Sequence, residues 1–261
     1  MRIVRFVTRG RTKYGIVEGE TVRELKGSPM GQTGKSKGAL KSDGPVHPLS
    51  EVKLLAPCTP SKMVCLGLNY RSHAQEFNLT IPSLPLIFLK PSTSAIGPRE
   101  DIVLPRGWKR VDYEAELGVV IGREAKDVPE QRAMEYVFGY TCFNDVSERI
   151  AQITDGQWTR AKGYDTFAPI GPWIETELDA TDLKVETYVN GEVRQSGRTS
   201  ELIFNIPQLI SFISSVMTLL PGDIIATGTP AGIGPINPGD SVEIRIEGIG
   251  SLKNGVVEQP A

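Results

Sequence analysis

The sequence predicts an α+β fold in which β-strands dominate and a few helices flank them. Short apolar or alternating runs are numerous, and they do not alternate regularly with helical patterns. Turn signals separate these runs at short intervals, including Asn190-Gly191, Pro221-Gly222-Asp223 and Pro238-Gly239-Asp240. With 261 residues, of which 39% are hydrophobic and 23% charged, the chain can form one large domain with a small one attached.

The first part of the chain is expected to form a small β domain. Residues 1–25 alternate apolar and polar side chains, which predicts a meander with turns at Arg11–Gly15 and Glu18–Glu20. Residues 27–47 are rich in Gly, Ser and Lys and show no sustained periodicity, so they predict a flexible surface loop. The region Pro57–Pro60 marks the boundary to the main domain. The expected division is a small β domain over residues 1–56 and a main domain over residues 57–261.

The main domain is expected to open with a strand followed by a short helix. The apolar run Met63–Leu68 predicts a buried strand, and Ser72–Phe77 predicts a helix in which Ser72 and Gln75 form a capping box. Further expected elements are strands at Tyr140–Asn144, Lys184–Val189, Glu192–Gln195, Ile224–Ala226 and Val242–Ile246, and helices at Pro129–Phe138, which ends before Gly139, and at Pro207–Leu220.

Three acidic residues, Asp112, Glu114 and Glu116, stand at spacing two in an otherwise apolar run. This alternation predicts a strand with one carboxylate-bearing face, on which neighbouring acids lie roughly 6.6 Å apart. At an effective dielectric of about 20, each adjacent ionised pair repels by about 2.5 kcal/mol, so a positive partner is expected. An all-oxygen set of ligands suits Mg²⁺, Mn²⁺ or Ca²⁺, whereas zinc usually takes Cys or His. An acidic face that simply points into water is the alternative.

His73 and Glu76 lie three residues apart in the first expected helix and therefore on one face of it. A carboxylate beside an imidazole can fix the tautomer of the ring and raise its basicity, which is what a general base requires. An ordinary pair on the protein surface is the alternative interpretation.

Three further segments carry groups suited to an anion. Asp145 is expected to cap a helix whose first turn carries Arg149 and Gln152. Lys162 lies in a loop among aromatic residues, where its ammonium could bind an anionic oxygen or its stem could simply pack on the rings. The glycine-rich stretch 227–234 resembles an anion cradle, but it lacks the Gly-Lys-Ser/Thr ending of a nucleotide-binding loop.

The composition limits the partners and the location of the protein. A net charge of −2 argues against a nucleic-acid-binding protein, which normally has a basic surface. The longest apolar segment, Leu209–Leu220, is too short to span a bilayer, and residues 1–10 lack the apolar core of a signal peptide. We therefore expect a cytoplasmic protein that binds neither membranes nor nucleic acids. The cysteines Cys58, Cys65 and Cys142 are expected to be buried reduced thiols.

Five motifs, in identity and order, resemble the fumarylacetoacetate hydrolase family. They are Gly67–Glu76, Asp112–Leu117, Asn144–Ser147, Lys162–Pro172 and Thr227–Pro230, and the resemblance runs from about residue 57 to the end of the chain. It implies a mixed β-sandwich roll, with residues 57–261 as the catalytic domain, usually assembled as a homodimer. Among bacterial members, which carry a similar short N-terminal domain, the chain looks most like 2-hydroxyhepta-2,4-diene-1,7-dioate and 5-carboxymethyl-2-hydroxymuconate isomerases.

By resemblance, three carboxylates hold a divalent cation, Mg²⁺ or Mn²⁺, for which Ca²⁺ could substitute in a crystal. Asp112 departs from that role, and we expect it to pair with Lys109 or Arg110. The implied metal ligands are Glu114, Glu116 and Asp145. The implied catalytic residues are His73 and Glu76, an acid–base dyad on a segment that can close over the substrate, and Lys162, which binds an anion. The implied substrate contacts are Arg149, Gln152, Gly228 and Thr229.

Together these residues predict a metal-dependent enzyme for a small 2-oxo acid or 2-hydroxy-dienoate. Charge developing on the 2-oxygen in an enolate would be stabilised by the cation and Lys162, while His73 moves a proton or activates water. The preferred interpretation is an isomerase or decarboxylase of the 2-hydroxyhepta-2,4-diene-1,7-dioate type in aromatic degradation. Acylpyruvate hydrolysis of the fumarylpyruvate type and oxaloacetate decarboxylation or tautomerisation stay open, as does a non-catalytic dicarboxylate-binding protein. The segment Phe77–Pro85 is expected to set the accepted substrate length.

Overall fold

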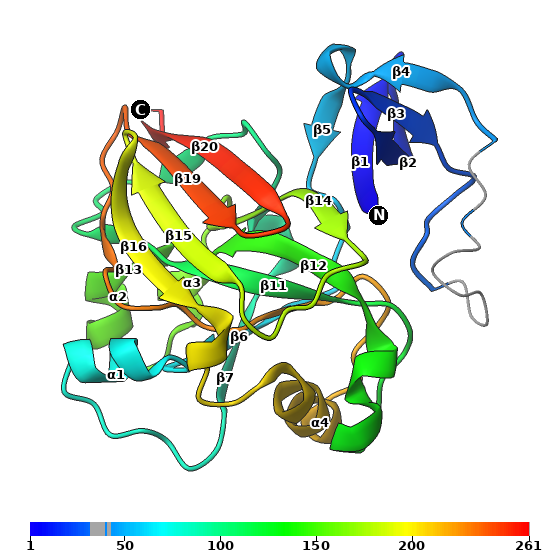
Figure 1. The fold of residues 1–261 in the computed structure, drawn as a ribbon. Helices are drawn as coiled ribbons and strands as arrows, with labels where there is room; N and C mark the ends of the chain where they lie inside the picture. Colours follow the sequence, from blue (N-terminus) through cyan, green and yellow to red (C-terminus); the bar gives the residue numbers. More distant parts are fainter. Residues whose placement is uncertain (32–39, 41–42, 261) are drawn as a thin grey trace.

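The structure, a computed structural model, describes residues 1–31, 40 and 43–260. Within these residues strands dominate and form sheets of 12, five and three strands, flanked by short helices (Figure 1). The predicted β-dominated α+β fold is therefore confirmed. Part of the predicted flexible loop at 27–47 lies outside the described residues, and its last residues, Val46 and His47, belong to strand β4.

The large sheet runs through most of the molecule in the order β4-β3-β2-β1-β14-β12-β11-β17-β6-β7, with β5 beside β1 and β8 beside β14. Its strands are β1 Arg2–Thr8, β2 Arg11–Glu18, β3 Thr21–Glu24, β4 Val46–Pro48, β5 Lys53–Leu55, β6 Met63–Gly67, β7 Leu86–Lys90, β8 Ala95–Ile96, β11 Ala115–Ile121, β12 Val137–Asn144, β14 Ala168–Glu175 and β17 Ile224–Ala226.

Two smaller sheets complete the strand structure. The five-stranded sheet, in the order β16-β15-β19-β20-β9, contains β9 Ile102–Leu104, β15 Lys184–Val189, β16 Glu192–Arg198, β19 Ser241–Ile246 and β20 Gly250–Glu258. The three-stranded sheet, in the order β13-β10-β18, contains β10 Val111–Tyr113, β13 Ser147–Glu148 and β18 Gly234–Pro235.

The helices are few and short. They are α1 Arg71–Glu76, α2 Arg149–Thr154, α3 Thr159–Lys162 and α4 Ile206–Val216, with 3₁₀ turns at Leu49–Glu51, Ser92–Ser94, Glu130–Tyr136 and Thr199–Glu201. The helix α4 confirms the one expected after residue 206, and it begins with a capping box in which Asn205 and Gln208 bond reciprocally.

The main core lies between the middle of the large sheet and the five-stranded sheet. Leu117 of β11 and Cys142 of β12 share one cluster of buried apolar side chains with Val185, Ile244 and Leu252 of the smaller sheet. Figure 1 shows the yellow and red strands of that sheet lying over the green strands β11 and β12. The arrangement is a sandwich whose two inner faces supply alternate residues to the core.

The N-terminal strands continue the large sheet across the predicted domain boundary, because Ile3 of β1 pairs with Ile174 of β14. The turn predicted at Arg11–Gly15 is wrong, since those residues belong to β2. The chain reverses at Arg9 and Gly10, which have φ angles of 47° and 72°. These left-handed conformations make the tight turn that joins two twisted strands.

The helix predicted at Pro129–Phe138 is also wrong in part. The segment Glu130–Tyr136 is a 3₁₀ helix, and the strand β12 begins immediately after it at Val137. Gly139, expected just past a helix, lies inside this strand. A Cβ atom there would come within 2.5 Å of the Glu175 carbonyl oxygen, so the glycine allows β14 to approach closely.

The short helix α1 confirms the helix expected near Ser72, but the predicted capping box is wrong. Tyr70 takes the N-cap position, and the Ser72 hydroxyl accepts a hydrogen bond from the backbone N–H of Ala231 at 3.5 Å. The helix therefore contacts the glycine-rich stretch 227–234 through a side chain that sequence reasoning assigned to the helix itself.

Two further observations concern the membrane and the cysteines. None of the helices in the described part of the chain is both long and apolar enough to cross a bilayer. Cys58, Cys65 and Cys142 are buried free thiols, as predicted. Burial raises the pKa of the Cys58 thiol to about 12.

The first Pro-Gly-Asp turn carries a buried carboxylate that ties β6 to β17. Asp223 is fully buried and accepts hydrogen bonds from the Ser61 hydroxyl at 2.6 Å, the Lys62 ammonium at 2.5 Å and the Leu220 backbone N–H at 2.8 Å. The second such turn ends in Asp240, which is partly exposed and accepts from Asn190 at 2.7 Å. The same tripeptide therefore supplies a buried carboxylate that connects two strands in one place and forms a surface turn in the other.

We predict that Asp223→Ala lowers the free energy of unfolding by about 3 kcal/mol, because it removes a fully buried carboxylate that several part-buried donors share. Asp240→Ala is the matched control and is expected to cost about 1 kcal/mol, because its two hydrogen bonds, from Asn190 and from the Asn237 backbone N–H, are exposed. Urea unfolding followed by fluorescence measures both. Equal losses in the two variants would contradict the connecting role assigned to Asp223.

Candidate functional site

Three carboxylates meet where β11 and β12 begin and end. Glu114, Glu116 and Asp145 are buried, and one oxygen from each lies within 4.8 Å of the others. The backbone carries them together, because Ala115 pairs with Asn144 and the Asp145 N–H donates to the Glu114 carbonyl at 2.9 Å. The predicted metal ligands therefore converge, and the alternative of an acidic face pointing into water is wrong for this strand.

The acidic run is two strands and not one. The run breaks at Glu114, so β10 belongs to the three-stranded sheet and β11 to the large sheet. Asp112, on β10, is fully buried and pairs with Arg110 at 2.9 Å, as expected, and also with Arg149 at 2.8 Å. Its carboxylate oxygens are thus bound by arginines, and Asp112 is not part of the cluster that Glu116 and Asp145 form with Glu114.

Cationic side chains hold most oxygens of the cluster. Asp145 accepts from Lys90 at 2.6 Å on one oxygen and from Lys162 at 2.5 Å on the other. Glu114 accepts from Arg149 at 2.5 Å and from Lys162 at 3.1 Å. Lys162 therefore bridges two of the three expected ligands.

Glu116 is the carboxylate with a position left for a cation. Its Oε2 accepts the backbone N–H of Gly228 at 2.7 Å, whereas its Oε1 is buried and has no hydrogen-bond partner among the described residues. A buried carboxylate oxygen without a donor is costly unless a cation meets it. Three carboxylates that each offer an oxygen as a ligand suit a hard divalent cation, so the residues present fit such an ion.

The electrostatics of the cluster support the same conclusion. Burial, together with Asp145 and Glu114, raises the pKa of Glu116 well above its usual range. Burial acts in the same direction on Glu114, but Lys162 and Arg149 outweigh it and hold the pKa of Glu114 well below its usual range. Added positive charge beside Glu116 would favour its ionised form, as a metal ligand requires.

Lys90 belongs to this cluster, although the sequence analysis did not single it out. It ends the strand β7, is fully buried, and donates to Asp145 and, at 3.0 Å, to the Val146 carbonyl. Burial lowers the pKa of its ammonium. The signal that could have found it is a lysine directly after the apolar residues Leu86–Leu89, since such a residue is buried only with a partner.

His73 and Glu76 lie on α1 as predicted, with Nδ1 of the imidazole 3.2 Å from a Glu76 oxygen. The other Glu76 oxygen accepts the backbone N–H of Gly232 at 3.1 Å. The ring of Phe77 stands edge-on to the imidazole at 5.1 Å between centroids. The carboxylate therefore holds the imidazole through Nδ1, leaving Nε2 as the ring nitrogen that Glu76 does not engage, and it also joins α1 to the glycine-rich stretch.

The helix expected to follow Asp145 begins later than predicted. Glu148, not Asp145, caps α2 and accepts the backbone N–H of Ala151, because the Asp145 carboxylate is engaged by two lysines. Arg149 and Gln152 do lie on the first turn of α2 and bond to one another at 2.7 Å. The other guanidinium N–H groups of Arg149 donate to the carboxylates of Asp112 and Glu114, so Arg149 orients the acidic cluster.

Lys162 ends the short helix α3 and is almost completely buried. Its ammonium lies 4.9 Å from the centre of the Phe88 ring, so it packs on an aromatic face as well as binding carboxylates. Burial lowers its pKa, but the carboxylates of Asp145 and Glu114 outweigh burial and raise it. The two carboxylates therefore favour the charged form of Lys162 within the cluster.

The glycine-rich stretch packs against the acidic cluster through Gly228, whose N–H donates to Glu116. Gly228 has a φ of 97°, and a Cβ atom there would lie 2.8 Å from Asn69, so the position requires glycine. Thr229 is almost buried, and its hydroxyl accepts from Gln195 at 2.8 Å. The stretch thus offers a backbone N–H to a ligand carboxylate and a hydroxyl beside it.

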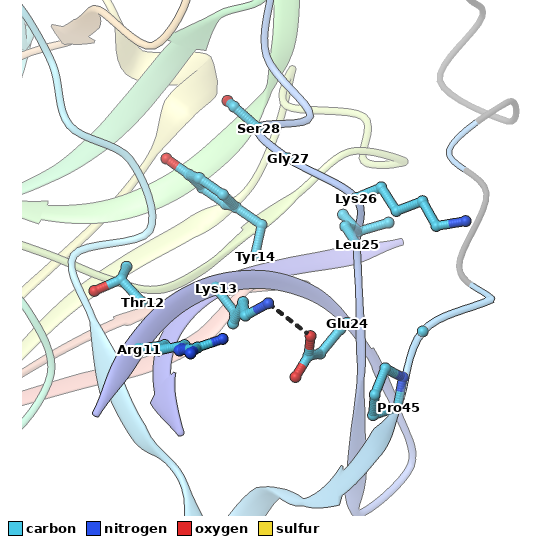
Figure 2. A pocket seen from close by; sticks show the side chains of 11 residues that line it. Arg11, Thr12, Lys13, Tyr14, Glu24, Leu25, Lys26, Gly27, Ser28 and Pro45 are labelled. Atoms are coloured by element: carbon cyan, nitrogen blue, oxygen red, sulfur yellow. Dashed lines mark ion pairs between the residues drawn. The ribbon is translucent and has the colours of Figure 1, made fainter. Parts of the chain in front are cut away.

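A separate pocket lies in the N-terminal domain, away from these residues (Figure 2). It has a volume of about 790 Å³, and two of the basic side chains that line it already have acidic partners. Lys13 pairs with Glu24 at 3.2 Å, and Lys26 pairs with Asp43 at 2.9 Å. The pocket shares no residue with the acidic cluster.

Fold and site together define an enzyme with a β-sandwich core and a buried carboxylate centre for a divalent cation. Residues 62–257 match the family described as fumarylacetoacetate (FAA) hydrolase C-terminal, and residues 1–57 match the one described as Rv2993c-like, N-terminal. The chain belongs to the fumarylacetoacetate hydrolase family.

Three solved structures resemble the chain over its whole length. A 5-carboxymethyl-2-hydroxymuconate delta-isomerase from Mycobacterium smegmatis is 47% identical, with a TM-score of 0.92 and coverage of 99% of this chain and 100% of that one. A 2-hydroxyhepta-2,4-diene-1,7-dioate isomerase from Mycobacterium marinum is 46% identical, with a TM-score of 0.91 and full coverage of both chains at 100%. A maleylpyruvate hydrolase from Sphingobium sp. SYK-6, in complex with manganese (II) ion and pyruvate, is 32% identical, with a TM-score of 0.82 and coverage of 100% of each.

Relatives known by sequence extend this range. Protein Rv2993c of Mycobacterium tuberculosis is 48% identical over 99% of both chains. The 2,4-didehydro-3-deoxy-L-rhamnonate hydrolase of Sphingomonas sp. is 41% identical over 99% of this chain and 96% of its own. Oxaloacetate tautomerase Fahd2a, mitochondrial, of Rattus norvegicus is 42% identical over 85% of this chain and 75% of its own. Isomerases and hydrolases are thus its relatives, and the chain is an enzyme of the family.

We predict that Glu114→Ala abolishes binding of Mn²⁺ and Mg²⁺, because it removes one of three carboxylates and leaves Lys162 and Arg149 facing the site. Asp112→Asn is the matched control on the same run of acids, and it is expected to bind Mn²⁺ within a few-fold of the wild type. Titration calorimetry with each metal measures both affinities. Retained metal binding in Glu114→Ala would contradict the ligand assignment.

Proposed function

We propose that the chain isomerises a 2-hydroxy-dienedioate of the 2-hydroxyhepta-2,4-diene-1,7-dioate type by moving a proton through an enolate. The observation that carries the proposal is the likeness, over 99% of the chain or more, to solved isomerases of this substrate class. The residues of the site suit that reaction, since they combine a place for a cation, a fixed ammonium and a histidine with an oriented carboxylate.

The charges of the site favour a dianionic end group. The carboxylates Glu114, Glu116 and Asp145 are matched in number by the cations Lys90, Lys162 and Arg149, which pair with Asp145 and Glu114 and leave Glu116 without a cationic partner in the described part of the chain. A divalent cation held by the three carboxylates would leave the centre with an excess of positive charge, which stabilises negative charge on oxygens of a bound ligand. A substrate carboxylate and a neighbouring oxygen that becomes negative supply the matching charge.

The chain's own groups then divide the work. The Lys162 ammonium is fixed, buried and charged, so it donates to the oxygen on which charge develops. Nδ1 of His73 faces Glu76, and Nε2 takes a proton from one carbon or oxygen of the substrate and returns it to another. Gly228 and Thr229, and the amide of Gln152, bind the carboxylate end of the substrate, while Arg149 holds Glu114 in place.

Hydrolysis and tautomerisation are the alternative reactions at the same site. Each alternative is supported by a relative. One is a hydrolase 41% identical over nearly the whole chain, and the other is an oxaloacetate tautomerase 42% identical over 85% of it. The three reactions share an enolate whose charge lies on its oxygen. Return of the proton to a carbon of the enolate completes isomerisation or tautomerisation, whereas attack of water on a carbonyl carbon breaks the adjacent carbon–carbon bond and releases the enolate.

We also propose that the resident cation is Mg²⁺ or Mn²⁺ and that the protein is a cytoplasmic homodimer. Exposed apolar side chains gather on the chain between α1 and the end of β7, which supports burial of this segment against a second copy. They are Phe77, Leu79, Ile81, Leu84, Leu86 and Leu89. Light scattering that gives twice the mass of the chain would support the dimer, and the mass of a single chain would contradict it.

A panel of substrates tests the proposed reaction. Purified protein loaded with Mg²⁺ is offered a 2-hydroxy-dienedioate, an acylpyruvate and oxaloacetate, and each product is followed by absorbance and mass spectrometry. We expect isomerisation of the dienedioate to exceed the other turnovers at least tenfold in kcat/KM, a difference of about 1.4 kcal/mol in barrier. Preferred cleavage of the acylpyruvate would replace the proposal with the hydrolase alternative.

We predict that His73→Ala lowers kcat about a hundredfold or more while leaving Mn²⁺ affinity unchanged, because the imidazole moves protons and is not a metal ligand. Gln75→Ala, an exposed change on the same helix, is the matched control and is expected to retain full activity. Steady-state rates on the preferred panel substrate and titration calorimetry with Mn²⁺ measure the two effects. Loss of metal binding in His73→Ala would place the imidazole in the cation site instead.

A further inference from the structure

Gln195 is a buried amide whose position depends on an irregularity of β16. It is 1% exposed and lies on the strand that returns from the Asn190-Gly191 turn. Thr187 of β15 pairs with Gln195, but Tyr188 pairs with Val193, so the register shifts by one residue between them. A bulge of this kind redirects the side chains that follow it, and it turns Gln195 toward the interior.

All four hydrogen-bonding positions of the Gln195 amide are used. Its Oε1 accepts from the Ala115 backbone N–H at 3.0 Å and from the Thr187 hydroxyl at 2.7 Å. Its Nε2 donates to the Pro230 carbonyl at 2.8 Å and to the Thr229 hydroxyl oxygen at 2.8 Å. Ala115 immediately follows the metal-ligand candidate Glu114, so one side chain joins the acidic strand to the glycine-rich stretch.

The orientation of this amide is chemically determined. A backbone N–H can only donate and a backbone carbonyl can only accept, so the oxygen of the amide must face Ala115 and its nitrogen must face Pro230. The amide cannot be rotated by half a turn without losing both bonds. It follows that the hydroxyl oxygen of Thr229 is an acceptor toward Gln195.

The direction of the Thr229 proton follows from that bond. Because its oxygen accepts from Gln195, the hydroxyl proton must point elsewhere, and within the described part of the chain it meets no acceptor. Thr229 is 4% exposed, so solvent access to this proton is small. A nearly buried hydroxyl with an unused proton is suited to donate to an anionic oxygen of a ligand.

The glycine-rich stretch, which carries Thr229, also packs closely against β16. A Cβ atom at Gly197 would lie 2.5 Å from the Pro230 ring, and one at Gly232 would lie 2.5 Å from the Arg194 carbonyl oxygen. These glycines let the stretch pack directly on β16, so that Gln195 reaches both Thr229 and Pro230 without a bridging water.

We propose that Gln195 is a positioning residue that fixes the Thr229 hydroxyl as a hydrogen-bond donor to the substrate's carboxylate. This inference rests on the proposed function, in which Thr229 contacts that carboxylate. Gln195 itself does not touch the substrate. It sets the direction of one proton, and through Ala115 it keeps that proton in register with the strand of the acidic cluster.

A double-mutant cycle with oxalate, a small chelating dianion, tests the inference. Titration calorimetry on the Mg²⁺-loaded protein gives the dissociation constant of oxalate for the wild type, Gln195→Met, Thr229→Val and the double variant. Each single variant is expected to bind oxalate about tenfold more weakly, because a hydrogen bond to an ionised acceptor is lost. The double variant is expected to bind no more weakly than Thr229→Val, since Gln195 acts through the hydroxyl alone.

Two companion variants keep the test decisive. Thr187→Val removes one donor to the same amide on the side away from Thr229, and it is expected to bind oxalate within about twofold of the wild type. Gln195→Asn retains an amide that is too short to span Ala115 and Thr229, and it replaces Gln195→Met if that variant does not fold. On the preferred substrate, Gln195→Met is expected to raise KM with kcat nearly unchanged, as for a lost ground-state contact.

The outcomes separate the inference from the proposed function. Unchanged oxalate affinity in Thr229→Val overturns the substrate contact itself, and with it the inference. A tenfold loss in Thr229→Val with no loss in Gln195→Met overturns only the role of Gln195. A further loss when Gln195→Met is added to Thr229→Val also overturns it, because the amide would then act as general support for the loop.

Discussion

The structure depends on how the repulsion among three carboxylates that lie together inside the protein is offset. Oxygens of Glu114, Glu116 and Asp145 lie within 4.8 Å of one another. At an effective dielectric of about 20, each ionised pair at that separation repels by about 3.5 kcal/mol. Buried charges of one sign persist only where opposite charge is fixed beside them, and Lys90 and Lys162 contribute it without solvent competition. Neither lysine forms an ion pair with Glu116, and a divalent cation would supply the positive charge that this carboxylate lacks.

The fold brings these charges together by interrupting a strand. The break at Glu114 passes the chain from the three-stranded sheet to the large sheet, and backbone groups at such a break lose their ladder partners. Side chains replace those partners, since the Glu114 N–H donates to Asn144 at 3.0 Å and the Ala115 N–H donates to Gln195 at 3.0 Å. A continuous strand would alternate its acids along one face at fixed spacing. The interruption lets Glu114 and Glu116 turn toward Asp145.

Local pattern was sufficient where the chemistry is local. Period-three spacing paired His73 with Glu76, and Asn190-Gly191 gave a hairpin, whereas the period-two spacing of the acids predicted one strand where the structure has two. Interactions between distant segments could not be obtained this way. The sequence analysis missed Lys90 and Gln195 because their partners lie 55 and 80 residues away, at Asp145 and Ala115. Asp145 was assigned to a helix cap because a capping bond is the local use of an aspartate, and two lysines from other elements outweigh it.

His73 and Glu76 are joined to the glycine-rich stretch 227–234 in one hydrogen-bonded unit. Glu76 bonds His73 with one oxygen and the Gly232 backbone N–H with the other, while Gln195 holds Thr229 and Pro230 of the same glycine-rich stretch. The imidazole, the loop that contacts a carboxylate and the acidic strand therefore share a single chain of bonds. In the proposed reaction, proton transfer needs the imidazole at a fixed distance from a substrate that the strand and the loop hold. A fold that links all three through the buried amide of Gln195 and the carboxylate of Glu76 sets that distance before the substrate binds.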